Sequence, residues 1–138
     1  MKKSTWMCFA LTVLAATTIV LSALPPRSKE DLEKTATDIV VGEVKQVYTA
    51  VRENKPGMVD TLYCFEIGVT KVDKGDHGKE GKVLMARAWA PVKRPSGWAG
   101  PQGQNVIPEG GKTYRFYLVE GKDGGLDAIT PNGIEASR

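Results

Sequence analysis

The sequence predicts a mainly β protein: a small five-stranded antiparallel barrel with one short N-terminal helix and a long Pro/Gly turn-rich loop. Segments rich in β-branched and aromatic residues recur along the chain, and clusters of Pro, Gly, Asn and Asp separate them. An antiparallel barrel or sandwich hides both the apolar faces and the edges of so few strands. Residues 24–138 are enough for a single domain with its own core.

A short helix is predicted to begin after Ser28, which is a suitable N-cap. Glu30 and Asp31 would lie in its first turn, where acidic side chains oppose the positive end of the helix dipole. The helix is expected to end by about Thr37. The β-branched run Asp38–Val47 then predicts the first strand.

The later strands are predicted by side chains that alternate between apolar and polar. A turn at Glu53–Gly57 precedes the second strand, and Lys122–Gly125 makes a tight hairpin before the last one. In the second strand, Tyr63 and Phe65 belong to the face expected to point inward. The expected strands after the first are Thr61–Val72, Lys82–Ala90, Thr113–Glu120 and Leu126–Thr130.

The first 23 residues have the pattern of a secretory signal peptide. Lys2 and Lys3 make a basic start, and no charge follows from Ser4 through Pro26. We therefore expect cleavage near Ala23 and an exported protein, periplasmic or extracellular. The alternative is an uncleaved N-terminal membrane anchor, because the uncharged stretch is almost long enough to cross a bilayer. No contact with a membrane beyond this segment is expected.

Charge and cysteine usage narrow the function classes. The chain has 19 Lys and Arg residues against 16 Asp and Glu, and two of the 19 lie in the leader, so the mature domain is nearly neutral. A nucleic-acid partner is not expected, because it would require a concentrated basic face. Only Cys64 follows the leader, which excludes an internal disulfide in the mature domain. Its apolar surroundings predict a buried, unreactive thiol.

The triplet Pro-x-Gly occurs three times between residues 94 and 111 and once more at residues 131–133. Proline at the second position and glycine at the fourth are typical of type I turns, for which Arg94–Gly97 is the first candidate. A connection this long without regular structure is unusual unless it has a function. Its apolar residues and prolines favour a folded, Ω-like loop.

This loop is the predicted binding surface, spanning residues 89–111. Trp89 and Trp98 would offer aromatic faces, and neighbouring amides and cations would supply directional hydrogen bonds to a sugar ring or an extended peptide. The alternative is that both tryptophans pin the loop to the barrel. The full set of candidate ligand-binding residues is Trp89, Lys93, Arg94, Trp98, Gln102, Gln104 and Asn105.

Three segments, "TATDIVVGEV", "LYCFEIGVTKVDKG" and "YRFYLVEG", resemble the β-core of netrin-like and tissue-inhibitor-of-metalloproteinase-like domains. The resemblance covers roughly residues 30 to 120 and implies an OB-like barrel. Metalloproteinase inhibitors of this class chelate zinc through an N-terminal cysteine pair, which the mature chain lacks, so only the fold is implied. "RPSGWAGPQGQ" and "PNGIE" are also similar to a group of uncharacterised exported bacterial proteins.

An enzyme is the less favoured class. Asp73, Asp76 and His77 in "VDKGDHGKEGK" would be the site of a small metal-dependent hydrolase. Their spacing matches no familiar zinc or calcium loop, and a solvated turn is the simpler interpretation. A carboxylate pair such as Glu43 with Glu66 is another candidate for acid–base chemistry. No catalytic residue, metal or other cofactor is assigned.

The sequence thus predicts an exported, non-catalytic binding domain. It would engage a cell-envelope or extracellular partner, a peptide or a glycan, through residues 89–111. Besides the hydrolase, the alternative is a purely structural envelope protein that dimerises through strand edges.

Overall fold

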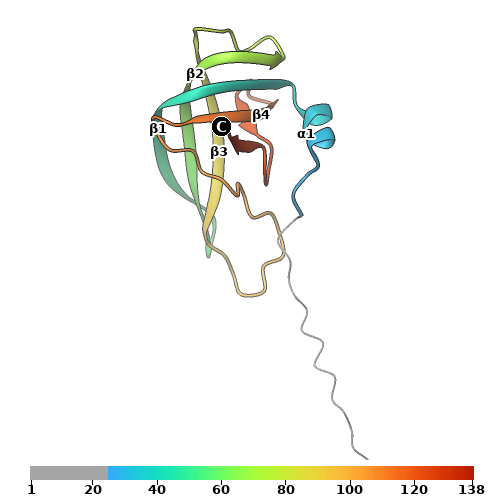
Figure 1. The fold of residues 1–138 in the computed structure, drawn as a ribbon. Helices are drawn as coiled ribbons and strands as arrows, with labels where there is room; N and C mark the ends of the chain where they lie inside the picture. The colour runs from blue at the N-terminus through green and yellow to red at the C-terminus, as the bar shows by residue number, and fades with distance from the viewer. Residues whose placement is uncertain (1–24) are drawn as a thin grey trace, which may run out of the picture.

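A computed structural model describes residues 25–138; the predicted signal peptide, residues 1–23, lies outside this range. The fold is mainly β, as predicted, with one short helix beside a curved sheet (Figure 1). Within residues 25–138 no helix has the length and apolar character needed to cross a membrane. The elements are α1 Lys29–Thr35, β1 Asp38–Lys55, β2 Met58–Lys74, β3 Val83–Lys93, β4 Thr113–Glu120, β5 Leu126–Ala128 and β6 Ile134–Ala136.

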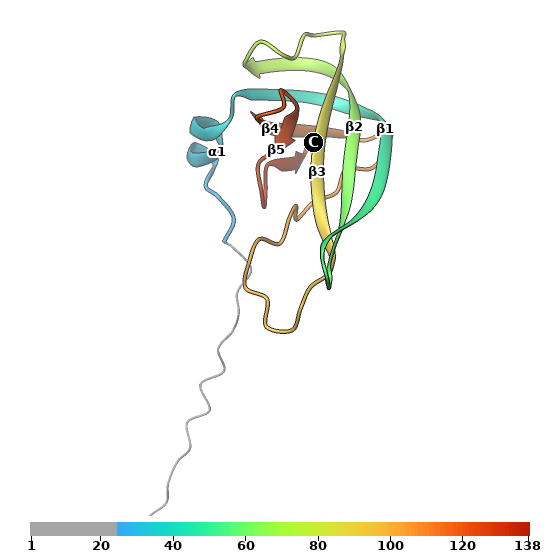
Figure 2. The ribbon, with the colours of Figure 1, turned by 180° about the vertical axis from the view of Figure 1, so that it is seen from behind.

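Five strands close into a ring. β1 pairs with β2, β2 with β3, β3 with β5 and β5 with β4, and β4 returns to the first residues of β1. The sixth strand, β6, was not predicted; it pairs with the first half of β4. Figure 2 shows β3 beside β5, with α1 beyond β5.

The expectation that all strands are antiparallel is wrong for one pair, since β3 and β5 run parallel. The reason is geometric. Strand directions can alternate around a closed ring only if the number of strands is even, so a ring of five must contain one parallel pair. Here that pair is a single bridge between Arg87 and Asp127, which we call the seam.

The first two strands are longer than predicted. β1 continues through the expected turn as far as Lys55, and β2 begins at Met58, so the turn shrinks to Pro56 and Gly57. Fifteen pairs between Ile39–Lys55 and Met58–Lys74 hold the two strands together. The far halves of the two strands, residues 46–66, form a hairpin arm whose β1 side is mostly exposed.

Apolar side chains form two clusters, one inside the ring and one outside it. The inner cluster contains Phe65 and Phe116, with Ala86 and Ala88 supplying small side chains from β3. The outer cluster lies under α1, where Leu32 packs with Ile39, Tyr117 and Ile129. Ser28 caps α1 as predicted, its hydroxyl accepting the N–H of Asp31 at 3.1 Å. The helix therefore covers the outer face of the ring beside β4.

Side chains hold the seam where the backbone ladder is missing. Arg87 on β3 donates two hydrogen bonds to Asp127 on β5, at 2.7 and 2.9 Å, and two more to Asp123 in the β4–β5 turn. Gln104 makes a second link, because its backbone N–H bonds the Trp89 carbonyl and its buried side-chain amide donates to the carbonyls of Ala128 and Ile129. The long loop thus fills the space where β3 and β5 diverge.

We predict that Gln104→Leu destabilises the domain by about 1–3 kcal/mol, because two buried carbonyls lose their shared donor. Gln102→Leu is the matched control, since Gln102 is half-buried and its amide bonds only the nearby Gly100 carbonyl. Urea unfolding of both variants measures the difference. Equal destabilisation would show that Gln104 does not hold the seam.

Candidate functional site

The first turn of the 94–112 loop differs from the predicted geometry by one residue. The first turn is closed by the Trp98 N–H and the Pro95 carbonyl, at 3.2 Å, so Gly97 is its third residue rather than its fourth. Gly97 has φ +75°, which that position requires in a type II turn. Gly103 instead lies so close to the backbone of Trp89 and Ala90 that a Cβ atom would overlap them. The repeated triplet therefore serves different tasks in different copies.

Trp98 packs against the loop and its neighbour Arg94. The Arg94 guanidinium carbon lies 5.7 Å from the ring centroid of Trp89 and 5.9 Å from that of Trp98. Arg94 also forms a largely buried ion pair with Asp60, to which Asn54 donates a further hydrogen bond at 2.6 Å. These contacts attach the loop to the β1–β2 arm.

The predicted binding residues do not form one exposed surface. Arg94 and Gln104 use their polar groups mainly within the domain. Lys93 and Asn105 are exposed, whereas Gln102 is half-buried. Trp89 and Trp98 are also half-buried, and Arg94 lies between them. Of the seven residues, Trp89 alone also lines the groove described next.

A groove of about 720 Å³ crosses the outer face of the sheet. Its principal side chains alternate along the strands with interior residues such as Phe65 and Ala88, so they point away from the ring. The end of α1 and the segment that follows β5 form its far wall. The β1, β2 and β3 residues that line it include Tyr48, Arg52, Leu62, Cys64, Arg87 and Trp89.

Sequence reasoning missed this groove because its lining comes from segments far apart in the chain. Cys64 illustrates the difficulty. It was expected to be buried, but it is half-buried and lines the groove, because it alternates with the interior Phe65. The sequence did contain one indication of the groove: the alternating pattern places Leu62, an apolar residue, on the outward face of the second strand.

The groove is aromatic, apolar and cationic. Tyr48 donates a hydrogen bond to Glu66 at 2.9 Å, which raises the pKa of the phenol. Three arginines line the groove, and two are paired: Arg27 with Asp31, and Arg87 with the seam carboxylates. Among residues 25–138 no ion pair engages the third, Arg52.

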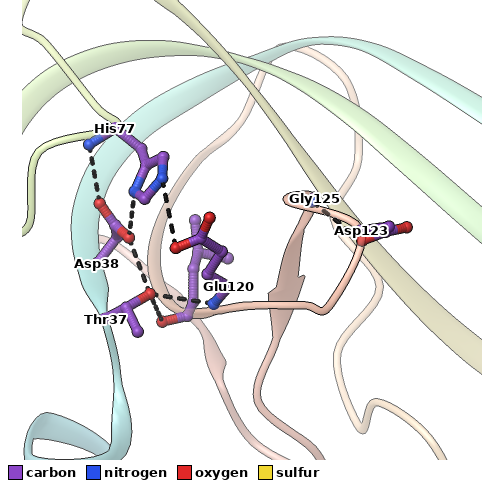
Figure 3. A network of polar contacts seen from close by, with 7 residues as sticks. Thr37, Asp38, His77, Glu120, Asp123 and Gly125 are labelled. Carbon is purple, nitrogen blue, oxygen red and sulfur yellow. Dashed lines mark hydrogen bonds and ion pairs between the residues drawn. The ribbon is translucent and has the colours of Figure 1, made fainter.

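Of the residues proposed for a hydrolase, His77 and Asp73 contact different partners. Asp38 is buried; its Oδ1 accepts the His77 backbone N–H at 3.1 Å, and its Oδ2 lies 2.9 Å from His77 Nδ1 (Figure 3). Thr37 donates to the same carboxylate, and Glu120 lies 3.8 Å from His77 Nε2. The network fastens the β2–β3 connection to the start of β1.

Asp73, by contrast, pairs with Arg115, which holds the pKa of this carboxyl below its usual range. Asp76 is exposed. Within residues 25–138, no three His, Cys, Asp or Glu side chains lie close enough to hold a metal ion. The other carboxylate pair is also engaged elsewhere, since Glu43 pairs with Lys45 and Glu66 accepts the Tyr48 hydroxyl.

We predict that Gly75→Ala destabilises the domain more than Gly57→Ala. Both glycines have positive φ, +89° and +79°, so both substitutions carry a similar backbone cost. Only at Gly75 would the new Cβ overlap the Asp38 carboxylate. We expect the difference to be about 1–3 kcal/mol, because the Asp38 network must shift. Thermal unfolding measures it, and equal losses would contradict the proposed role of Asp38.

The Arg87–Asp123 pair predicts a specific pH dependence. Hydrogen bonds from Arg87, with one from the Gly125 N–H, lower the pKa of Asp123 to about 2. The unfolded chain has an Asp pKa of about 3.9, so the stabilisation is complete above about pH 4 and is lost as the pH falls toward about 2.

We therefore expect Asp123→Asn to be less stable than the unchanged protein at pH 7, with the difference vanishing between about pH 4 and pH 2. Urea unfolding at a series of pH values measures this. Asp76→Asn is the control, because the structure shows no ion pair for exposed Asp76 within residues 25–138. A difference for Asp123→Asn that persists at pH 2 would contradict the assignment.

The chain was compared with known proteins. No protein-family model, no curated protein and no solved structure matches it. The functional proposal therefore rests on the geometry and the side chains of the groove and of the neighbouring loop.

Proposed function

We propose that this protein is an exported, non-catalytic binding domain that holds a cell-envelope or extracellular peptide or glycan in its outer groove. Trp89, the first residue of the predicted 89–111 binding segment, lies on β3 and lines this groove. The supporting observation is the groove itself, whose volume of about 720 Å³ is within the range of ligand sites in proteins.

The groove lining suits such a ligand chemically. Tyr48 and Trp89 offer aromatic surface against which a sugar ring or an apolar side chain packs. Arg52 supplies hydrogen-bond donors that no acid among residues 25–138 occupies, so it can bind a carboxylate or a hydroxyl group of the ligand. The partly buried ion pairs at the seam keep the floor of the groove in place.

We further propose that the ring is an OB-type barrel. Barrels of this type have five strands and are partly open, and the outer face of strands 2 and 3 binds oligosaccharides and oligonucleotides. The single bridge between β3 and β5 is consistent with a partly open barrel. The groove includes the corresponding face of β2 and β3.

Fluorescence of Trp89 tests this function. In a chain with Trp6→Phe and Trp98→Phe, Trp89 is the only tryptophan. We expect its emission to shift, and its quenching by acrylamide to fall, when cell-wall glycan fragments or envelope peptides are titrated into the protein. Separate glycan and peptide series identify the ligand class.

Arg52→Ala should weaken this binding by about tenfold, since a charged hydrogen bond is worth about 1.5–3 kcal/mol. Lys55→Ala is the matched control, because Lys55 is an exposed cation of the same strand outside the groove. Equal effects of the two substitutions would indicate nonspecific attraction. If neither ligand series changes Trp89 emission, the proposed function is wrong.

A further inference from the structure

The far half of β1 has an uncovered edge. β4 pairs only with Asp38–Glu43 of β1, and the last backbone contacts on that side join Val44 to Gly111 and Lys112. From Gln46 onward, β1 pairs only with β2 within the described part of the chain. Figures 1 and 2 both show this half of β1 as the outermost strand of the arm.

This edge lacks the usual protection against strand pairing. Residues 46–51, Gln-Val-Tyr-Thr-Ala-Val, contain no charge, no proline and no glycine. Val51 is 72% exposed and Tyr48 is 49% exposed. Natural edge strands are normally blocked by lysine, proline, a bulge or a covering loop. Here the register shifts lie at either end, between Val44 and Gln46 and between Glu53 and Lys55, so the stretch between them is regular.

The segment is complementary to itself in one antiparallel register. With Thr49 opposite Thr49 of a second copy, Val51 faces Val47 and Tyr48 faces Ala50. Arg52, the charged residue that follows the segment, then lies opposite Gln46, so no like charges meet. Cross-strand pairs of β-branched and aromatic residues stabilise sheets.

Neighbouring registers are poorer. A two-fold axis at Ala50 would place Val47 opposite Glu53 and Tyr48 opposite Arg52. An axis at Tyr48 would place the exposed Val51 opposite Lys45. Only the axis at Thr49 both covers Val51 with an apolar side chain and pairs threonine with threonine.

We propose that β1 is a dimerisation edge, through which two copies of this chain pair antiparallel over residues 46–52 with the two-fold axis at Thr49. The β1–β2 sheet of one copy then continues into the β1–β2 sheet of the other. Tyr48 and Arg52 line the groove beside this edge, so the two grooves meet at the axis. The proposal rests on the free edge and its self-complementary register, and it does not depend on the proposed ligand.

Disulfide trapping tests the register. In a Cys64→Ser background, Thr49→Cys places two thiols at the axis, with Cα atoms about 4.5–5.5 Å apart, within the range of a disulfide. Mild oxidation should convert this variant largely to a covalent dimer. Ala50→Cys is the matched control, because two Ala50 Cα atoms would lie more than about 7 Å apart, too far for a disulfide.

Sedimentation equilibrium tests the dimer without a crosslink. The unchanged protein should show a concentration-dependent dimer, and Val51→Lys should weaken it by about tenfold or more, because lysine on an edge blocks pairing. Val92→Lys is the control: Val92 is 63% exposed, but it lies on β3. Circular dichroism verifies that both variants are folded.

A monomer at all concentrations would overturn the proposal, including a monomer whose β1 edge binds a foreign peptide strand. Equal crosslinking of Thr49→Cys and Ala50→Cys would overturn the register. Equal weakening by Val51→Lys and Val92→Lys would move the interface away from β1.

Discussion

The closure of five strands into a ring is the constraint on which the rest of this structure depends. An odd ring must contain one parallel pair, and a parallel pair cannot be joined by a short hairpin. In this chain β3 and β5 share a single bridge, so the seam depends on side chains. Arg87 donates hydrogen bonds to the carboxylates of Asp123 and Asp127. Gln104 forms hydrogen bonds with backbone carbonyls on both sides of the seam, those of Trp89, Ala128 and Ile129. The long loop brings Gln104 to the seam.

The seam lies in the floor of the groove, because Arg87 and Asp127 belong to both. Where β3 and β5 diverge, the outer surface is hollowed, and Arg87, Trp89 and Asp127 line the hollow. The contacts that close the ring therefore also form the floor of the proposed binding site. Loss of the Arg87–Asp123 pair in acid should accordingly change both stability and binding. Trp98 is not among the groove-lining residues; the Arg94 guanidinium lies near its ring and that of Trp89.

The length of β1 links the groove to the proposed dimer. β4 pairs with β1 only as far as Glu43, and Val44 makes the last contacts on that side. From Gln46 onward, therefore, no strand among residues 25–138 covers this edge of β1, which curves with β2 into the arm. Its outward side chains line the groove, while its free backbone edge provides the pairing surface. Exposed apolar residues on such an edge favour association in any protein. In this protein the charged residues next to the segment restrict the register.

The sequence by itself determined the local structure: the Ser28-capped helix, the range of β4, and the inward face that includes Phe65. The helix cap, the β4 range and the inward face follow from alternation, capping and turn residues, which act over a few positions, whereas β1, β2 and β3 extend beyond their predicted ranges. The parallel seam, the arm, the outer position of Cys64 and the buried roles of Arg94 and Gln104 were decided by the tertiary structure. Of the predicted ligand-binding residues, only Trp89 lines the groove, which the sequence did not predict. The reason is physical: a groove and a seam are formed by strands far apart in the chain, and alternation along one strand does not reveal which strand lies beside it.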